Sequence, residues 1–221
     1  MRYSISFILL MSCFFCFSQE EKVVYKNELP RFSIRANVAI PKAVTSEVLR
    51  HSFAGVLTGD ANVDYKLFSG FFVGLGYSYS YYKTQKAFYY QNIYTNMQTL
   101  NGYLKLGYDK FFDKNAFYTI SLNAGYNYNT FQGIKYKSDT LMGKYPTNFG
   151  GGFIEPMFGL YFIVDPNFAI GGHISYNYTF SQFNPAYAGL DKWYEYKGLK
   201  NNWSMSAITF GFGFYYGISR K

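Results

Sequence analysis

Only a few residues of this chain could carry out catalytic or metal chemistry. The two histidines, His51 and His173, have no close pair of carboxylates in sequence and fall short of the usual set of metal ligands. Ser175 follows two residues after His173, so both side chains would lie on one face of a strand. A histidine and a serine can act as base and nucleophile when a third group orients the base. We therefore expect no metal and no cofactor, and His173 with Ser175 is the single catalytic hypothesis.

The two cysteines, Cys13 and Cys16, lie in a segment with the anatomy of a secretory signal peptide. Arg2 is the only charged residue among the first 19, and residues 5–17 form an apolar run. A run of that length fits the apolar region of a signal peptide and is too short for a membrane-spanning helix. The pattern predicts a signal peptide over residues 1–19 and export from the cytoplasm.

Cleavage after Gln19 would leave a mature chain without cysteine. Disulfides, thiolate catalysis and cysteine metal sites would then be excluded. A second interpretation is a lipoprotein cleavage box at Leu10-Met11-Ser12-Cys13, which would leave a lipidated Cys13. The apolar run continues past this cysteine, which favours the ordinary signal peptide.

The composition is typical of neither a soluble domain nor a helical membrane protein. The chain has 221 residues, which suits one domain. Aromatic residues make up 23% and charged residues only 15%, against about 25% charged in ordinary soluble domains. Mean hydropathy is nevertheless only −0.13, and outside the leader no run of about 18 apolar residues occurs. Apolar and polar residues are therefore interleaved, as in a strand with one face on lipid and one on a polar lumen.

Alternation with a period of two dominates after residue 30 and predicts strands. Between residues 71 and 81, for example, Phe71, Val73 and Leu75 share one face, and Ser78 and Ser80 share the other. Eight segments show such a pattern: 32–40, 57–65, 71–81, 100–108, 118–128, 154–162, 168–180 and 206–218. Pro156 cannot donate to a strand ladder, so it marks a bulge, or the sixth strand begins after it.

The connections between these segments alternate in length. Three are predicted to be tight turns, at 66–70, 112–116 and 165–167. Four are predicted to be long loops, at 41–53, 83–96, 129–152 and 181–203. An even strand count, short turns at one end and long loops at the other are typical of bacterial outer-membrane barrels. We predict an all-β fold, an eight-stranded antiparallel up-and-down transmembrane β-barrel over residues 32–221, preceded by a short periplasmic segment at 20–31.

With this pattern, the chain resembles the small outer-membrane β-barrels of the OmpA/OmpX type, in particular the single-domain barrels common in Bacteroidota. The resemblance covers residue 32 to the C-terminus. Gly213, Tyr216 and Ile218 match the spaced glycine, aromatic and hydrophobic residues by which the last strand of that family is recognised for assembly. The resemblance implies the cell outer membrane as location and the barrel-assembly machinery as a partner during insertion. The chain departs from the pattern by adding three residues, 219–221, where many members end on an aromatic residue.

The chemistry of the two strand faces indicates which one meets lipid. A soluble lipocalin-type barrel would place its apolar face inside. Here the polar faces carry mostly Gly, Ser, Thr and Asn, which suit the crowded interior of eight strands. The apolar faces carry large aromatic residues and almost no charge, and a soluble protein with that exterior would aggregate. We therefore expect the polar faces to line the lumen.

Four charged residues fall on the predicted lumen faces: Arg35, Asp60, Asp64 and Lys105. They should lie in the periplasmic half of the lumen, with Arg35 paired to Asp60 or Asp64 across the first two strands. Buried charges are usually paired, so we interpret the cluster as a structural plug. A gate for small solutes is the alternative, but eight strands leave a lumen too narrow for an open aqueous channel.

The sequence around His173 and Ser175 resembles the His-x-Ser pair of lipid A deacylase barrels, in which a glutamate on the following strand completes a triad. The resemblance would imply a hydrolase acting on lipid A. Residues 204–221 contain no acid, however, and alternation turns both side chains into the lumen, away from lipid. Glu155 on the preceding strand is predicted to lie four residues from His173 along the barrel, roughly 13 Å away and beyond hydrogen-bond reach. We therefore expect no enzyme.

The long loops are predicted to be basic and aromatic. The formal net charge of +8 becomes 8 − 1 = +7 if Arg2 leaves with the leader. The loop residues that we expect to contact partners are Tyr89, Tyr90, Lys135, Lys137, Trp193 and Tyr194. Basic and aromatic residues together favour anionic surfaces and binding interfaces. Expected partners are outer-membrane lipid, lipopolysaccharide phosphates, glycans or a surface protein, and not nucleic acid; the alternative is a solvated basic surface against lipid headgroups.

The sequence thus favours a non-enzymatic outer-membrane barrel with a structural, adhesion or envelope-interaction role. Three alternatives from other classes remain open: a lipid A-modifying enzyme, a conduit for small solutes, and the barrel component of a secretion or assembly machine.

Overall fold

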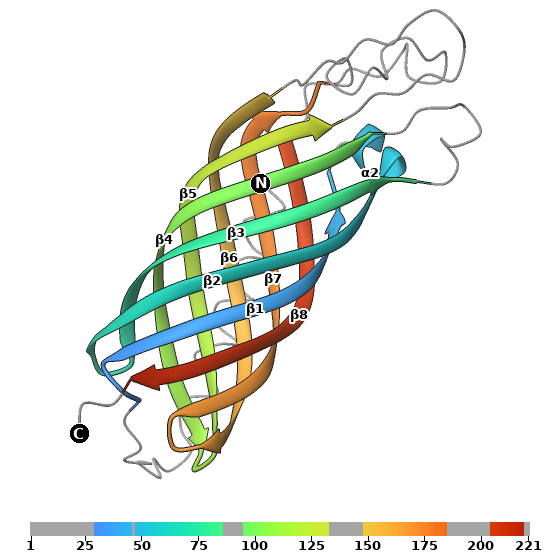
Figure 1. Ribbon diagram of the computed structural model, residues 1–221. Helices are drawn as coiled ribbons and strands as arrows, with labels where there is room; N and C mark the ends of the chain where they lie inside the picture. Colours follow the sequence, from blue (N-terminus) through green and yellow to red (C-terminus); the bar gives the residue numbers. More distant parts are fainter. Residues whose placement is uncertain (1–28, 46, 86–94, 133–147, 185–203, 219–221) are drawn as a thin grey trace, which may run out of the picture.

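The described residues of the computed structural model, 29–45, 47–85, 95–132, 148–184 and 204–218, form one closed antiparallel barrel of eight strands (Figure 1). Each strand pairs with its neighbour in the chain, and β1 pairs with β8 to close the barrel. The strands are β1 (Phe32–Ala43), β2 (Phe53–Phe68), β3 (Phe71–Thr84), β4 (Asn96–Asp113), β5 (Ala116–Gln132), β6 (Asn148–Asp165), β7 (Phe168–Gln182) and β8 (Ser204–Ile218). The predicted fold class is confirmed, whereas the predicted leader at 1–19 lies outside the described residues.

The strands are longer than the alternation in sequence predicted. They contain 12 to 18 residues, whereas a tilted strand needs about 9–11 to cross a bilayer. The extra residues lie mainly at the ends away from the short turns, where outward positions such as Gln98 and Gln132 are polar. Pairing continues there, from Asn96 opposite Gln132 downward. The apolar pattern therefore marks only the membrane-facing part of each strand, and the barrel wall continues beyond it.

The three short connections are two-residue turns, tighter than predicted, at Ser69-Gly70, Lys114-Asn115 and Pro166-Asn167. Ser69 (φ 42°) and Gly70 (φ 88°) both have left-handed backbone conformations, as a type I′ hairpin turn requires. In each hairpin the pairing shifts by one residue just before the turn, which leaves one apolar residue out of the ladder, Leu67, Phe112 and Val164. Such bulges add local twist, which helps a narrow barrel to close.

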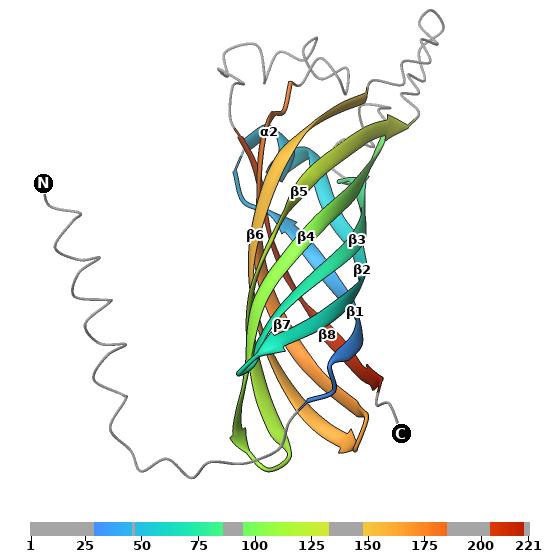
Figure 2. The ribbon, with the colours of Figure 1, turned by 90° about the vertical axis from the view of Figure 1, so that its left-hand side faces the viewer.

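The opposite end of the barrel carries a helix that the sequence analysis missed. The predicted loop at 41–53 was wrong in part, because β1 continues to Ala43 and a helix, α2 (Glu47–Ser52), precedes β2. Six residues are too few to show helical periodicity in sequence, and packing rather than propensity stabilises so short a helix. Figure 2 shows α2 at the end of the barrel away from the three short turns. Among the described residues, no helix has the length and apolarity to cross a membrane.

Pro156 lies inside a continuous strand, so both expectations for it were wrong. It pairs with Leu122 of β5 without a change of register. The ladder to β7 has a gap instead, between Ile154 opposite Tyr178 and Met157 opposite Ser175, and the register is the same on both sides. A proline lacks only the N–H donor, so the strand loses ladder pairing on one side and needs no bulge.

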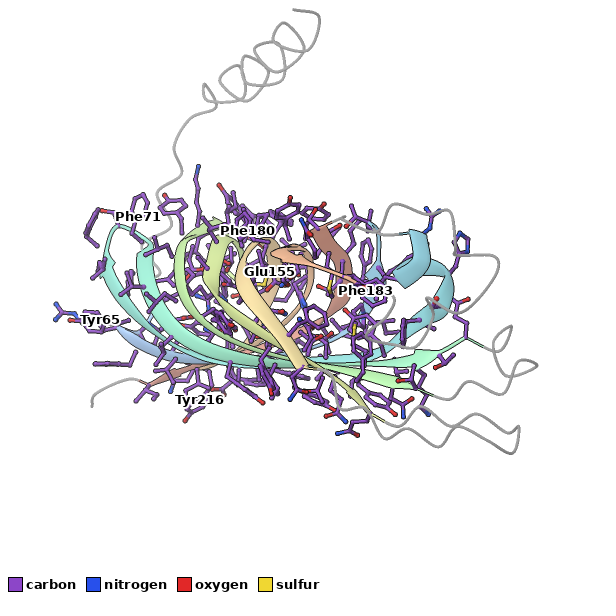
Figure 3. All side chains as sticks on the ribbon, turned by 90° about the horizontal axis from the view of Figure 1, so that it is seen from above. Tyr65, Phe71, Glu155, Phe180, Phe183 and Tyr216 are labelled. Carbon is purple, nitrogen blue, oxygen red and sulfur yellow. The ribbon has the colours of Figure 1, made fainter. Side chains whose placement is uncertain are left out.

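The orientation of the strand faces is as predicted. In β1, Ser33, Arg35 and Asn37 are buried, while Phe32 and Ile34 are exposed on the outside. Large apolar side chains cover the outer wall of every strand, including Leu75 (67% exposed), Leu104 (65%) and Phe212 (74%). Figure 3 shows Tyr65, Phe71 and Tyr216 pointing away from the barrel, with Glu155 midway along it. This apolar exterior around a polar lumen is the arrangement that lipid requires.

Tyrosines border the apolar outer wall at two levels. Tyr118 lies near the short turns and Tyr126 nearer the loop end of the same strand, both on outward positions of β5. Eight residues at about 3.3 Å each separate them by roughly 26 Å along the strand. With a tilt of about 40°, this corresponds to roughly 20 Å along the barrel axis, close to the apolar band of about 25 Å in outer-membrane barrels.

Candidate functional site: a charged lumen closed at both ends

Arg35 is the centre of an ion network that crosses the lumen. Its side chain is 1% exposed, and its Nε lies 2.8 Å from Asp64 Oδ2 on the neighbouring strand. The expected pair with a carboxylate of β2 is therefore present, with Asp64. Arg35 Nη2 also donates to Asp109 Oδ2 (2.6 Å), and Nη1 donates to Thr119 Oγ1 (2.8 Å). Thr119 Oγ1 in turn donates to Asp109 Oδ1 at 2.6 Å, so β1 is linked to the opposite wall at β4 and β5.

Aromatic rings enclose the guanidinium of Arg35. Its central carbon lies 4.4 Å from the ring centre of Phe72, 5.2 Å from that of Tyr215 and 5.9 Å from that of Tyr161. A cation near the faces of aromatic rings is attracted by their quadrupoles, and the attraction grows when water is excluded. Two carboxylates and three rings together offset the cost of removing this charge from water.

Asp109 is the functional residue that sequence reasoning missed. The predicted fourth strand ended at residue 108, whereas β4 continues to Asp113. Asp109 has the same parity as Tyr103, Lys105 and Gly107, which already pointed into the lumen. Extending the predicted strand by one residue would have identified it, but the apolar outward signal ends close to the turn.

The other two predicted lumen charges do not join the ion pair. Lys105 (1% exposed) donates to Asn62 Oδ1 at 3.2 Å, and Asn62 donates to Asp64 Oδ1 at 2.6 Å, so an amide separates the lysine from the carboxylate. Asp60 accepts a hydrogen bond from Asn37 Nδ2 (2.8 Å) and not from Arg35. The structure therefore brings together Arg35 and Asp64 and places Asp60 in a neighbouring environment.

Aromatic residues close the lumen beneath this network, at the end with the short turns. The closing cluster consists of Phe117, Tyr161, Ala169 and Tyr215, each at most 3% exposed. Phe117 stacks on Tyr161 with ring centres 5.2 Å apart and planes inclined by 12°. Gly213 makes this possible, because a methyl group there would lie 2.7 Å from the hydroxyl oxygen of Tyr161.

A second cluster, of a different kind, closes the lumen at the loop end. It contains Ala43, Leu49, Phe53, Tyr82, Met97, Phe131, Phe183 and Met205. Leu49 of α2 is 2% exposed and is the part of the helix that enters the barrel mouth. Figure 3 shows Phe183 nearer this end than Glu155. We call this group the apolar cap.

A small polar cavity separates the apolar cap from the ion network. Its volume is about 40 Å³, and its wall includes Asp60, Asn123, Glu155 and Ser175. A buried water needs roughly 10–15 Å³ of such space, so the cavity has room for about three waters. A space of this size can hold a few waters but does not form a wide passage along the barrel.

His173 and Ser175 both line this cavity, on the lumen face as predicted. Their contacts differ from those of a base and a nucleophile. Ser175 Oγ donates to Glu155 Oε1 at 2.5 Å and lies 2.5 Å from Thr209 Oγ1. His173 Nδ1 is buried with no hydrogen-bond partner among the described residues. The hydroxyl that would have to attack a substrate is thus held by a carboxylate, deep in the lumen.

The remaining predicted sites belong to the last strand and to the long loops. On β8, Gly213 points into the lumen, while Tyr216 (51% exposed) and Ile218 (45% exposed) lie on the outer wall. Their role as an assembly signal stays a prediction. The six loop candidates, Tyr89, Tyr90, Lys135, Lys137, Trp193 and Tyr194, all lie outside the described residues.

A narrow eight-stranded barrel with an aromatic-bordered apolar exterior has the fold of small outer-membrane β-barrel proteins, which confirms the predicted resemblance at the level of the fold. Neisserial surface protein A shares it with a TM-score of 0.55 and 14% identity, over 86% of this chain and 99% of that one. A major outer membrane protein from Thermus thermophilus also has a TM-score of 0.55 and 14% identity, over 85% and 98% of the two chains.

At these identities the likeness concerns the fold alone. The outer membrane enzyme PagL is similar only with a TM-score of 0.35 and 13% identity, over 84% of this chain and 99% of that one, which carries no argument about activity. No family model and no curated protein matches the sequence.

Proposed function

We propose that this chain is an outer-membrane barrel that acts through its loop end and not through its lumen, in an adhesive, structural or envelope-interaction role. The single observation that supports this is the closure of the lumen towards both ends. The aromatic cluster with the adjoining Arg35 network closes one end and the apolar cap the other, and a cavity of only about 40 Å³ lies between them. Because the lumen is closed, the ends of the strands and their connections remain as the surface that can bind partners. We call this the working surface.

The same closure argues against a solute conduit. Conduction would require the ion network and the apolar cap to open together. We expect the purified barrel to give no steady conductance in planar bilayers. Reproducible single-channel steps would contradict the proposal and favour the conduit.

The working surface that we propose is the basic and aromatic sequence of the connections at the loop end. Lys135 and Lys137 lie between β5 and β6, and Trp193 and Tyr194 lie between β7 and β8. The ligand chemistry that suits them is a phosphorylated, anionic glycolipid surface such as lipopolysaccharide, because lysines supply charge and aromatic residues supply apolar contact.

Binding to vesicles tests this ligand. Mature barrel in neutral-lipid nanodiscs would be mixed with vesicles that contain lipopolysaccharide, and the change of Lys135 and Lys137 to Gln should lower the bound fraction severalfold. Binding should also weaken between low and physiological salt, because surface charges are screened beyond roughly 8–10 Å.

A matched control removes the same charge from the other end of the barrel. Lys110 and Lys114 flank or form the second short turn and are exposed. Their change to Gln should leave binding unaltered. An equal loss in both variants would mean that net charge alone drives the association, and the proposed loop surface would be wrong.

A second candidate function is that of the barrel component of a secretion or assembly machine. It predicts a stoichiometric partner that co-purifies in mild detergent, whereas our proposal predicts a barrel that purifies alone.

A further inference from the structure

The cavity below the apolar cap carries negative charge that its own wall does not neutralise. Two carboxylates, Asp60 and Glu155, line it. The buried ammonium of Lys105 attracts Asp60, but it donates its hydrogen bond to Asn62 and does not line the cavity. Neither carboxylate forms an ion pair among the described residues, where the ion pairs belong to Arg35 with Asp64 and Asp109. One nearby ammonium for two buried carboxylates leaves negative charge without a direct partner, which is costly, so this arrangement calls for a further counter-charge.

Neutral donors satisfy only part of each carboxylate. Asp60 Oδ1 accepts from Asn37 Nδ2 at 2.8 Å and from the Tyr103 hydroxyl at 3.4 Å. Glu155 Oε1 accepts from Ser175 Oγ, and Oε2 accepts from Asn123 Nδ2 at 3.4 Å. These hydrogen bonds orient the carboxylates but leave their charge in place.

A second observation points independently to a ligand in the same cavity. Asn123 is 4% exposed and lines the cavity, and because its Nδ2 donates to Glu155, its Oδ1 is left buried without a partner among the described residues. A buried oxygen without a donor destabilises the fold unless something binds it. A cation in this cavity, with water in its shell, would give this oxygen and the two carboxylates of the same wall a partner.

We propose that the cavity binds one calcium ion, between the carboxylates of Asp60 and Glu155 and the side-chain oxygen of Asn123, with water completing its shell. Calcium takes oxygen ligands in flexible geometry, and its charge offsets both carboxylates. No three His, Cys, Asp or Glu residues of the described chain group as metal ligands, so neutral oxygens and water must supply the rest. Magnesium fits less well, because it gives up water reluctantly and the cavity has room for about three waters.

Calcium uptake during refolding tests the proposal directly. Because both ends of the lumen are closed, the mature chain would be refolded into detergent with radioactive calcium, or with a chelator as the blank. We expect one calcium per barrel. The double variant Asp60→Asn with Glu155→Gln should bind at least tenfold more weakly, while the exposed-acid control Asp113→Asn should bind like the parent.

Thermal unfolding gives a second readout that separates a cation site from a damaged fold. Calcium at 100 times its Kd should raise the unfolding midpoint of the parent by about 5–10 °C. In chelator the double variant should unfold at or above the parent's midpoint, because two like charges are gone, and calcium should not shift it.

Three results would overturn the proposal: no bound calcium in the parent, an equal shift of its midpoint by sodium chloride at matched ionic strength, or a double variant that still binds calcium. None of these results bears on the loop surface, so the proposed function stands or falls separately.

Discussion

The two ends of the lumen are closed by different means. At the short-turn end, Arg35 lies between two carboxylates and three aromatic rings, and every partner comes from a strand. At the loop end, the apolar cap packs around Leu49, which comes from a helix in a connection. The first closure combines an ion network with aromatic rings and is built into the wall, whereas the second is apolar and includes a residue from a docked segment.

This difference indicates that the two ends should respond differently to change. The loss of one member of a buried charge network is strongly destabilising, because the partners left behind are charged and shielded from water. An apolar cluster at the end of the barrel can collapse or open locally when it loses a side chain. The short-turn end should therefore control the stability of the whole barrel, and the loop end should control only its own mouth.

The largest expected effect is the loss of the cation at the short-turn end. Arg35→Met should cost about 3–5 kcal/mol of unfolding free energy, because Asp64 and Asp109 lose their ion-pair partner and Lys105 contacts neither of them directly. Urea unfolding of the barrel in lipid vesicles measures it. The triple variant Arg35→Met with Asp64→Asn and Asp109→Asn should recover most of the loss. A single variant that loses less than about 1 kcal/mol would refute the distinction between the ends.

A smaller and local effect is expected from the apolar cap. Leu49→Ala should cost about 2 kcal/mol, near the lower limit for a buried leucine, because the mouth can relax. Hydrogen exchange should rise at the loop ends of β3 and β4, near Thr84 and Asn96, and stay unchanged beside Arg35. Leu49→Met is the control and should behave almost like the parent. Faster exchange along entire strands would show that the cap supports the whole barrel.

The smallest effect is expected at the first short turn. Ser69 has a left-handed conformation (φ 42°), which glycine adopts without steric cost, so Ser69→Gly should stabilise the barrel by about 0.5–1 kcal/mol. Gly70→Ala should have the opposite sign, since its methyl group would lie 2.3 Å from the carbonyl oxygen of Asp109. Unfolding midpoints of both variants check the pair. A neutral Ser69→Gly would mean that the turn is less rigid than the wall.

Much of the fold could be predicted from sequence because every strand of a membrane barrel shows the same alternation of apolar and polar residues. Lipid on one side and a crowded polar lumen on the other impose a period of two. Alternation therefore gave eight strands and the correct inward face, including Arg35, His173 and Ser175. It did not give the strand ends, because beyond the lipid the outward positions need no longer be apolar. Asp109 was missed near one such end, and Pro156 was misjudged because one missing donor does not end a strand.

What the sequence by itself determined is which side chains share the lumen, since parity along a strand is a local property. Only the tertiary structure decided which of them meet. Arg35 contacts Asp109 and Thr119 from 74 and 84 residues away because closure of the barrel brings β1 opposite β4 and β5. Leu49 likewise packs in the apolar cap only in the closed barrel. Its helix is too short to show a periodic sequence pattern, so tertiary packing decides its position.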